Sequence, residues 1–175
     1  MTTATETAPA GTFTLDTVHS TFGFAVKHNG VSTFRGSFEQ ADARLEDGVL
    51  VGTAQVDSVK TAIPDLKGHL VSADFFDAEN TPTVTFRSTD IRVGDGGAVE
   101  VDGDLTVRGV TKAVTATGSY ASGIGISGKE VVGLDLEATV DRRDHGITWQ
   151  AELPSGGEVL GWDVTLQIHL ELIAA

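Results

Sequence analysis

The sequence of 175 residues contains no cysteine. This absence excludes disulfides, thiolate metal sites and a cysteine nucleophile, so the fold must be stabilised by packing. Basic residues are also few, because 12 Lys and Arg stand against 25 Asp and Glu and give a formal net charge of −13. A field of this sign repels nucleic acid phosphates and anionic membrane surfaces, so neither is expected as a partner.

Long hydrophobic runs are missing as well. The first eleven residues, MTTATETAPAG, have no basic start and no apolar core, and so do not form a recognisable signal peptide. No stretch is long enough for a membrane-spanning helix. We expect residues 1–11 to be a disordered tail and residues 12–175 to form one domain of a cytoplasmic protein, since this length suits a single core.

Alternation between apolar and polar residues is the main pattern in the chain. A period of two is typical of a strand with one buried face, and runs of Val and Thr between turn residues also favour strands. The strands that we expect lie near residues 22–28, 33–38, 49–60, 82–93, 99–107, 111–121, 134–141 and 163–172. A sheet of about eight long strands with one apolar face must close or fold back, which predicts a barrel or a sandwich.

One segment, IPDLKGHLVSADFFDAENTP, interrupts the strands. Pro64 suits the first turn of a helix, and Leu66 and Leu70 then share one face. Ser72 can cap a second short turn that runs through Phe76. The segment is therefore predicted to form two short helical pieces beside the sheet.

Four ordered blocks of sequence carry a family resemblance: FTLDTVHSTFGFAVKH, STFRGSF, the HL, S.DFF and P.VTF pieces of one segment, and GDLTVRGVTKAV. They span nearly the whole chain, from about Phe13 to Ile173, and make it similar to the YceI-like family of polyisoprenoid-binding or lipid-binding domains. The resemblance implies an all-β fold, an eight-stranded antiparallel, extended lipocalin-like barrel with a short helical insert. It also implies a long apolar channel for an isoprenoid or similar lipid tail.

Two features depart from the family pattern. Many members carry an Arg-Asp pair before the His-Leu and an arginine after it, whereas residues 66–68 read LKG before His69 and Val71 follows Leu70. A head-group preference known for the family is therefore not carried over to this chain. Many members are also exported to the periplasm, and this sequence shows no export signal.

A lipid tail offers almost no hydrogen-bonding groups, so its site needs apolar area and shape rather than a catalytic constellation. We predict the following ligand-binding residues from their inward positions: Phe22, Phe24, Val26, His28, Phe34, Phe38, Leu70, Phe75, Phe86, Leu105, Leu134, Leu136, Trp162, Leu166 and Ile168. Each aromatic alone is explained equally well as a core residue, but together they favour a tall barrel with interior space. No catalytic residue, metal site or required cofactor is predicted, and the expected bound molecule is an isoprenoid or quinone-type lipid.

Phe75 and Phe76 are adjacent in a chain with only 6% aromatic residues. Neighbouring residues on a helical turn point about 100° apart. We therefore expect one ring to face the channel and the other to anchor the insert to the outside of the barrel, as a lid and its hinge. Trp162 shares the parity of Val164 in the last strand and is expected to point inward.

Two apparent motifs are set aside. Residues 123–128, GIGISG, fit a dinucleotide-binding pattern, but a strand follows where that motif needs a helix, so a glycine-rich hairpin is predicted. His19 and His28 are nine apart on one expected strand and so lie on opposite faces, and His169 belongs to an outer, polar face. With no H-E-x-x-H spacing, a metal site is not indicated.

Three classes of function remain open. The first is a lipid carrier or sequestering protein. The second is an enzyme that acts on an isoprenoid or quinone-type substrate in the same channel, with His28, His69 or Arg87 as polar groups. The third is a stress-related scaffold whose barrel is filled. Copurification of lipid separates the first two classes from the third, and turnover of that lipid separates the second from the first.

The negative net charge bears on the head group of the ligand. A prenyl diphosphate needs several cations gathered at the channel mouth, and the candidates are Lys27, Arg35, Lys67, Arg108, Lys112, Arg142 and Arg143. A neutral head group, such as a quinone or an amide, enters more easily. An apolar lipid is therefore the expected partner. The sequence leaves open whether two chains pair through an exposed strand edge, although members of the family that it resembles suggest a homodimer.

Overall fold

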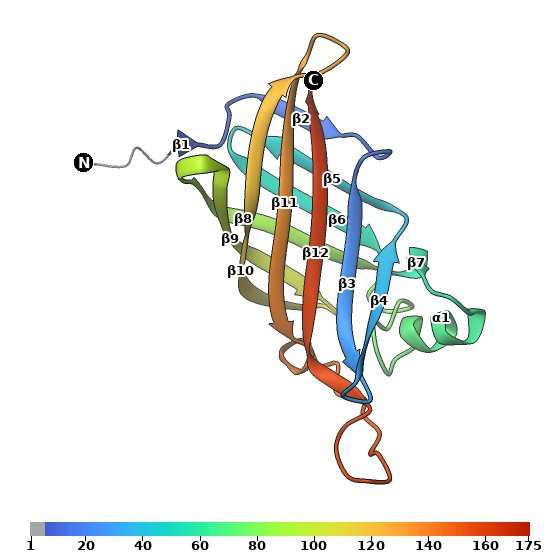
Figure 1. Cartoon of the computed structure of the whole chain (residues 1–175). Helices are drawn as coiled ribbons and strands as arrows, with labels where there is room; N and C mark the ends of the chain where they lie inside the picture. Colours follow the sequence, from blue (N-terminus) through green and yellow to red (C-terminus); the bar gives the residue numbers. More distant parts are fainter. Residues whose placement is uncertain (1–5) are drawn as a thin grey trace.

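Alternating residues build long antiparallel strands in the computed structural model, which describes residues 6–175 (Figure 1). The strands are β1 (Glu6–Thr7), β2 (Thr12–Leu15), β3 (Thr21–His28), β4 (Ser32–Phe38), β5 (Ala41–Glu46), β6 (Val49–Gln55), β7 (Val59–Lys60), β8 (Thr83–Val93), β9 (Ala98–Val107), β10 (Val110–Ile124), β11 (Glu130–Asp141) and β12 (Leu160–Ala174). The helices are α1 (Pro64–Val71) and the 3-10 helices η1 (Val56–Ser58), η2 (Asp95–Gly97) and η3 (Arg142–His145). Among the described residues, no helix is long and apolar enough to cross a membrane.

Eight strands close into a barrel in the order β12, β11, β10, β9, β8, β6, β5 and β2, and β2 then pairs with β12 again. All these pairings are antiparallel. Closure removes the unpaired edges that an open sheet would expose. The predicted eight-stranded antiparallel barrel with a short helical insert is confirmed.

On the edge that faces away from β11, the last strand, β12, has two partners along its length. Residues 172–174 pair with β2, whereas residues 160–169 pair with β3. From β3 the sheet continues through β4 to β7. At one end of the barrel, β3 and β4 therefore take the place that β2 holds at the other end, and the wall gains strands there (Figure 1).

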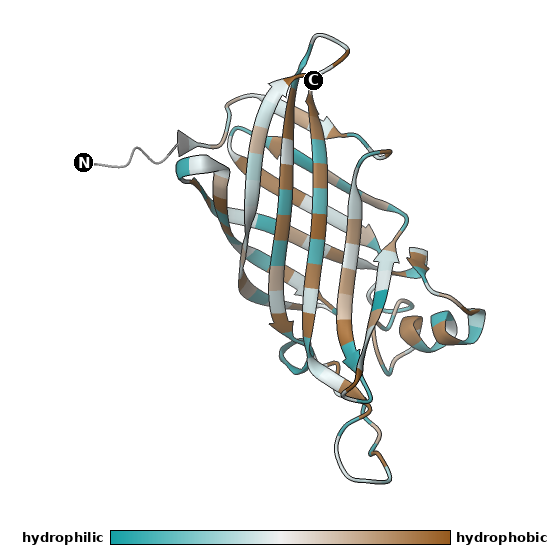
Figure 2. Cartoon of the chain, viewed as in Figure 1, coloured by the Kyte–Doolittle hydropathy of each residue, from teal (hydrophilic) through white to brown (hydrophobic). Residues whose placement is uncertain are grey.

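The end closed by β2 is packed with side chains. Its most deeply buried members, each at most 2% exposed, are Phe13, Leu45, Val93, Val101, Val132, Leu134 and Leu172. They come from six strands, and we call this region the filled end. Figure 2 shows the alternation along β11 and β12 that turns apolar residues to one face. Close packing of this kind contributes most of the stability of a small barrel without disulfides.

The N-terminal segment departs from the expected tail. Residues Glu6–Thr7 form β1 and pair with Val93 and Arg92 of β8. The neighbouring strand β6 pairs with β8 only as far as Arg87, so the edge of β8 beyond that point is open to β1. The remainder of the expected tail, residues 1–5, lies outside the described residues.

The insert contains one helix rather than two. The backbone N–H of Phe76 donates to the carbonyl of Leu70 at 3.0 Å, and Asp77 adopts a positive φ of 51°. These contacts fold the chain back onto the end of α1 as a series of turns, so a second helix does not start. The expected cap at Ser72 is present only as a turn contact, with its Oγ 3.3 Å from the backbone N–H of Asp74.

The glycine-rich stretch at residues 123–128 joins β10 to β11 as a hairpin, as predicted. The backbone N–H of Gly125 donates to the carbonyl of Lys129 at 2.8 Å, and Gly128 has a φ of 78°. A strand follows it directly, and there is no helix N-terminus here to receive a phosphate. The dinucleotide-binding interpretation is therefore excluded by the local structure.

Candidate ligand-binding cavity

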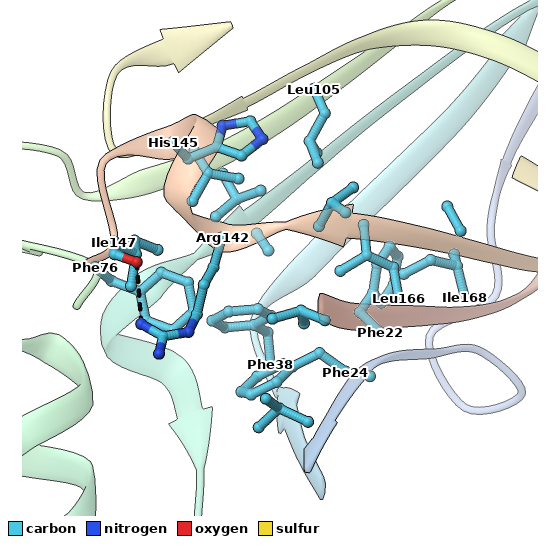
Figure 3. A pocket seen from close by; sticks show the side chains of 18 of the residues that line it. Phe22, Phe24, Phe38, Phe76, Leu105, Arg142, His145, Ile147, Leu166 and Ile168 are labelled. Carbon is cyan, nitrogen blue, oxygen red and sulfur yellow. Dashed lines mark hydrogen bonds between the residues drawn. The ribbon is translucent and has the colours of Figure 1, made fainter. Parts of the chain in front are cut away.

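The end of the barrel that contains β3 and β4 is hollow. A cavity of about 660 Å³ is lined by inward side chains of the strands, together with residues of α1 and η3 (Figure 3). We call this region the hollow end. On β11, Val132 and Leu134 belong to the filled end, whereas Leu136, Ala138 and Val140 line the cavity. The boundary between the two regions thus falls between successive inward residues of one strand.

Most of the predicted ligand-binding residues line this cavity. They are Phe22, Phe24, Val26, His28, Phe34, Phe38, Leu70, Phe75, Phe86, Leu105, Leu136, Leu166 and Ile168. The strands that carry them were predicted from the period-two alternation, and in the structure these strands surround the cavity. That these residues contact a ligand stays a prediction.

Two predicted residues, Leu134 and Trp162, do not line the cavity. Leu134 faces inward but is 2% exposed within the filled end. Trp162 lies where the pairing of β12 with β3 shifts between Leu160 and Val164, so the parity of a regular strand does not hold there. Its indole Nε1 donates to the carboxylate of Glu158.

Trp162 also stacks with two cations. The guanidinium carbons of Arg142 and Arg143 lie 4.2 and 4.7 Å from the centre of its ring. Such cation–π contacts hold the ring among charged groups at the end of β11. The inward direction predicted for Trp162 is therefore wrong.

Two glycines allow aromatic rings to lie against the wall. A Cβ atom on Gly36 would lie 2.4 Å from the ring of Phe24, and one on Gly103 would lie 2.4 Å from the ring of Phe86. No side chain fits at these distances. Glycine at both positions lets the rings rest on the neighbouring backbone, which keeps them from crossing the cavity.

Phe75 and Phe76 both line the cavity. The ring of Phe76 meets Phe24 and Phe38 edge to face, with centroids 6.1 and 5.6 Å apart. The ring of Phe75 lies 5.4 Å from that of Trp149. The expected anchor on the outside of the barrel is wrong, because the two residues lie in reversing turns, where the 100° spacing of a helix does not apply.

Exposed lining residues mark where the cavity reaches solvent. His28, Ser32 and Thr33 lie together at the end of the β3–β4 hairpin, and we call this region the mouth. His69 of α1 also lines the cavity, and its Nε2 lies 3.0 Å from the carboxylate of Asp74. Polar groups are thus found near this opening, whereas the side toward the filled end is apolar.

Arg142, considered from the sequence only as a head-group cation, is a buried residue of the site. It is 4% exposed and lines the cavity from η3. Its Nε donates to the carbonyl of Gly161 at 2.8 Å, and its Nη1 donates to those of Ile147 and Trp149 at 3.0 and 2.8 Å. Nη2 donates to the carbonyl of Leu160 at 3.2 Å.

These four bonds join η3 to the loop that follows it and to the first two residues of β12. Burial lowers the pKa of the Arg142 guanidinium, although the charges of Asp141 and Glu158 act in the opposite direction. Arginine nevertheless keeps its proton in proteins. The positive charge is held mainly by backbone dipoles, since none of the ion pairs found among residues 6–175 includes it.

His145 is the second buried polar residue of η3. It is 2% exposed and lines the cavity, and its Nδ1 lies 2.9 Å from the carbonyl oxygen of Val110. Figure 3 shows Arg142 and His145 toward one end of the cavity, with Phe22 and Ile168 toward the other. A 3-10 turn has no period-two signal, so the pattern of the sequence did not indicate either residue.

The remaining cations that were considered for a head group do not gather in the cavity. Within the described part of the chain, Arg142 is the only one of them that lines it. Arg35 donates to the side-chain oxygen of Gln167 at 2.9 Å, and Arg108 donates to the carbonyl of Phe75 at 3.0 Å. Arg87 is exposed on β8 and lies outside the cavity.

One polar cluster lies away from the cavity, where β2 leads into β3. One nitrogen or oxygen from each side chain of Asp16, His19 and Glu171 lies within 4.8 Å of the other two. Asp16 accepts hydrogen bonds from the backbone N–H of Val18 and His19 and from the imidazole at 2.9 Å. The His19 bond lowers the pKa of Asp16, and the same bond raises the pKa of His19.

These bonds form a turn that connects β2 to β3. His19 precedes β3, so the expectation that it shares a strand with His28 is wrong. His169 is exposed on β12 as predicted, and its Nδ1 lies 2.8 Å from the carboxylate of Asp135.

Comparison with known proteins places these features in context. The family model of the YceI-like domain matches residues 13–172. A UPF0312 protein of Staphylococcus aureus (strain N315) is 31% identical over 169 residues, which cover 91% of this chain and 95% of the relative. The YCEI protein of Campylobacter jejuni is similar in structure, with a TM-score of 0.73 and 26% identity over 85% of this chain and 90% of that one.

A polyisoprenoid binding domain from Saccharophagus degradans has the same fold. It matches with a TM-score of 0.67 and 16% identity, and the match covers 93% of this chain and 98% of that domain. BcnA of Burkholderia cenocepacia matches with a TM-score of 0.71 and 22% identity, over 90% of this chain and 98% of that one.

Proposed function

Because the chain belongs to the YceI-like family, we propose that it binds an isoprenoid or similar long apolar lipid in the cavity of the hollow end. Such binding serves carriage, storage or sequestration of the lipid. The observation that carries this proposal is the cavity itself, which is walled by aromatic and aliphatic side chains and ends at the filled end. The name of the Saccharophagus degradans domain, polyisoprenoid binding, is consistent with it.

The size of the cavity bounds the ligand. A methylene group takes about the volume of a water molecule in the liquid, ~30 Å³, so a cavity of about 660 Å³ holds roughly 20 carbons. Each buried methylene contributes about 0.8 kcal/mol, part of which offsets the cost of ordering the chain. Four or five isoprene units are therefore the expected buried length, with the tail toward the filled end.

The polar residues favour binding over catalysis. Of the three groups considered for an enzyme, Arg87 lies outside the cavity and His28 lies at its mouth. His69 pairs with Asp74, and its ring packs edge to face against Phe75 at 4.8 Å. This arrangement orients His69 within the insert and supplies no nucleophile beside a general base. A filled scaffold is disfavoured by the cavity volume.

Extraction of the purified protein with organic solvent, followed by mass spectrometry of the released lipids, tests the proposal. We expect a long apolar lipid at close to one molecule per chain. Phe38→Glu places a charge in the cavity and is expected to abolish copurification, because a buried carboxylate must remain hydrated. Arg35→Glu changes the outer face of the same strand and is the matched control, with occupancy unchanged.

Equal lipid occupancy in the folded Phe38→Glu variant and the wild type would refute the proposed site. Circular dichroism of each variant shows whether the barrel is intact. If the cavity variant does not fold, Phe34→Glu on the same strand repeats the test nearer the mouth.

A further inference from the structure

His145 presents one ring nitrogen to the cavity. The carbonyl oxygen of Val110, 2.9 Å from Nδ1, can only accept a hydrogen bond, so Nδ1 carries a proton and donates it. In the neutral ring, Nε2 is then an acceptor. Nε2 makes no hydrogen bond with any of residues 6–175, although the side chain is 2% exposed. No fully buried side-chain nitrogen or oxygen among the described residues lacks a partner, so Nε2 is reached from the cavity rather than enclosed in the core. A ligand that covers this acceptor must supply a donor, because an acceptor left buried without a partner is costly.

The surroundings of His145 restrict what that donor is. Buried neighbours in the same region of the core, Leu105, Val107 and Ile147, are apolar. The guanidinium of Arg142 has five N–H groups, and four of them donate hydrogen bonds to backbone carbonyls. The guanidinium therefore cannot present the paired N–H groups that grip a phosphate. The η3 end of the cavity thus offers one acceptor and very few donors.

Resting on the proposed function, we propose that Nε2 of His145 accepts a hydrogen bond from a hydroxyl group of the bound lipid. The preferred ligands are then long-chain alcohols, such as prenyl alcohols, or lipids with a hydroquinone ring. A quinone presents only acceptors to Nε2, and a prenyl diphosphate requires donors that this end of the cavity lacks. His145 lies toward the opposite end of the cavity from Phe22 and Ile168, so the tail extends toward the filled end (Figure 3).

The test compares geranylgeraniol with its methyl ether, which has the same chain but no hydroxyl donor. Binding to delipidated full-length protein is followed by tryptophan fluorescence or calorimetry. We expect the ether to bind about tenfold more weakly, because it leaves the His145 acceptor without a partner. In His145→Phe, the alcohol and the ether are expected to bind within twofold of each other.

Two further variants make the comparison specific. Phe38→Leu removes apolar contact area on the wall and is expected to weaken both ligands equally, which preserves the tenfold ratio. His145→Asn keeps a donor for the Val110 carbonyl but is too short to place an acceptor at Nε2. It repeats the test if His145→Phe does not fold.

The outcomes separate the two proposals. Equal binding of alcohol and ether by the wild type overturns the role of His145, while leaving lipid binding intact. Tighter binding of geranylgeranyl diphosphate than of the alcohol would also overturn the role of His145 and leave lipid binding intact. Failure of all three ligands to bind, with the cavity delipidated, overturns the proposed function itself.

Discussion

The filled end and the hollow end are made largely from the same strands, yet only one of them contains space. At the filled end, eight strands close tightly and large side chains such as Phe13 and Leu172 meet in the centre. At the hollow end, β3 and β4 widen the wall, and several lining residues are small, among them Gly52, Ala54 and Ala116. A wider wall with smaller side chains leaves a cavity that the barrel cannot fill itself.

This difference separates two uses of apolar residues. In the filled end they contact one another and stabilise the fold, whereas in the hollow end they border open space. Substitutions in the two regions should therefore differ in whether stability or binding is lost.

The largest effect is expected from truncation in the filled end. Phe13→Ala should lower the free energy of unfolding by about 3–5 kcal/mol, because it removes a fully packed ring and leaves a void. Phe34→Ala in the hollow end should cost roughly 1 kcal/mol, since that ring already borders open space. Urea unfolding of the ligand-free proteins measures the loss in free energy of unfolding for each variant. Equal losses would contradict the claim that one end of the barrel is packed and the other is hollow.

Arg142→Met should have the next largest effect on stability, about 2–4 kcal/mol, because four backbone carbonyls lose a charged donor. The neighbour Arg143 is exposed, donates from its guanidinium to the carboxylate of Asp141 and stacks on Trp162, but it holds no backbone carbonyl among the described residues, and it is the control. Arg143→Met should leave the urea midpoint nearly unchanged. Similar midpoints for both variants would mean that Arg142 does not hold the loop before β12.

A bulky residue near the boundary should shorten the cavity. Ala116 is buried on β10 and lines the cavity close to the filled end, whereas Ala113 is exposed on the same strand. Ala116→Phe should weaken binding of a twenty-carbon prenyl alcohol about tenfold and spare a ten-carbon one. Ala113→Phe should alter neither affinity in fluorescence titrations. Unchanged affinity for the twenty-carbon alcohol in Ala116→Phe would indicate that the tail does not reach this depth.

The smallest effect concerns the turn at Asp16 and His19. The raised pKa of His19 stabilises the fold below its ordinary value of 6.5, and this contribution is lost as pH rises through the folded pKa. The lowered pKa of Asp16 stabilises the fold above 3.8, and this contribution is lost as pH falls through the folded pKa. The melting temperature of the His19→Gln variant should therefore be lower than that of the wild type, and the difference should be largest between pH 3.8 and pH 6.5.

Salt should shrink that difference, because His19 is exposed to solvent. The melting temperatures of wild type and His19→Gln are compared at about pH 5 and about pH 8. If their difference is the same at both pH values, the effect comes from the hydrogen bond alone and not from the charge of His19.

Much of the fold could be predicted from alternation and from the family resemblance. The period of two correctly placed Val101 and Leu105 on β9 and Leu136 on β11, because regular strands leave no other direction for these side chains. The same rule failed at Trp162, where an irregular pairing breaks the parity. A bulge depends on contacts between strands and leaves no mark in the local pattern.

The boundary of the cavity could not be predicted, because filled and hollow segments of a strand have the same pattern. Leu134 and Leu136 are both inward leucines, and only the side chains across the barrel decide which one borders open space. His145 was missed, and Arg142 was considered only as a head-group cation, for a different reason. They lie on a 3-10 turn, where burial depends on how the loop before β12 folds over them.

The dependence of affinity on chain length tests the central claim most directly. Prenyl alcohols of ten, fifteen, twenty, thirty and forty carbons are titrated into the delipidated protein under one set of conditions. We expect affinity to rise with each isoprene unit up to about twenty carbons and not to rise further, because the filled end stops the tail. Absence of binding at every length, or a gain that continues to forty carbons, would contradict a hollow end closed by a filled one.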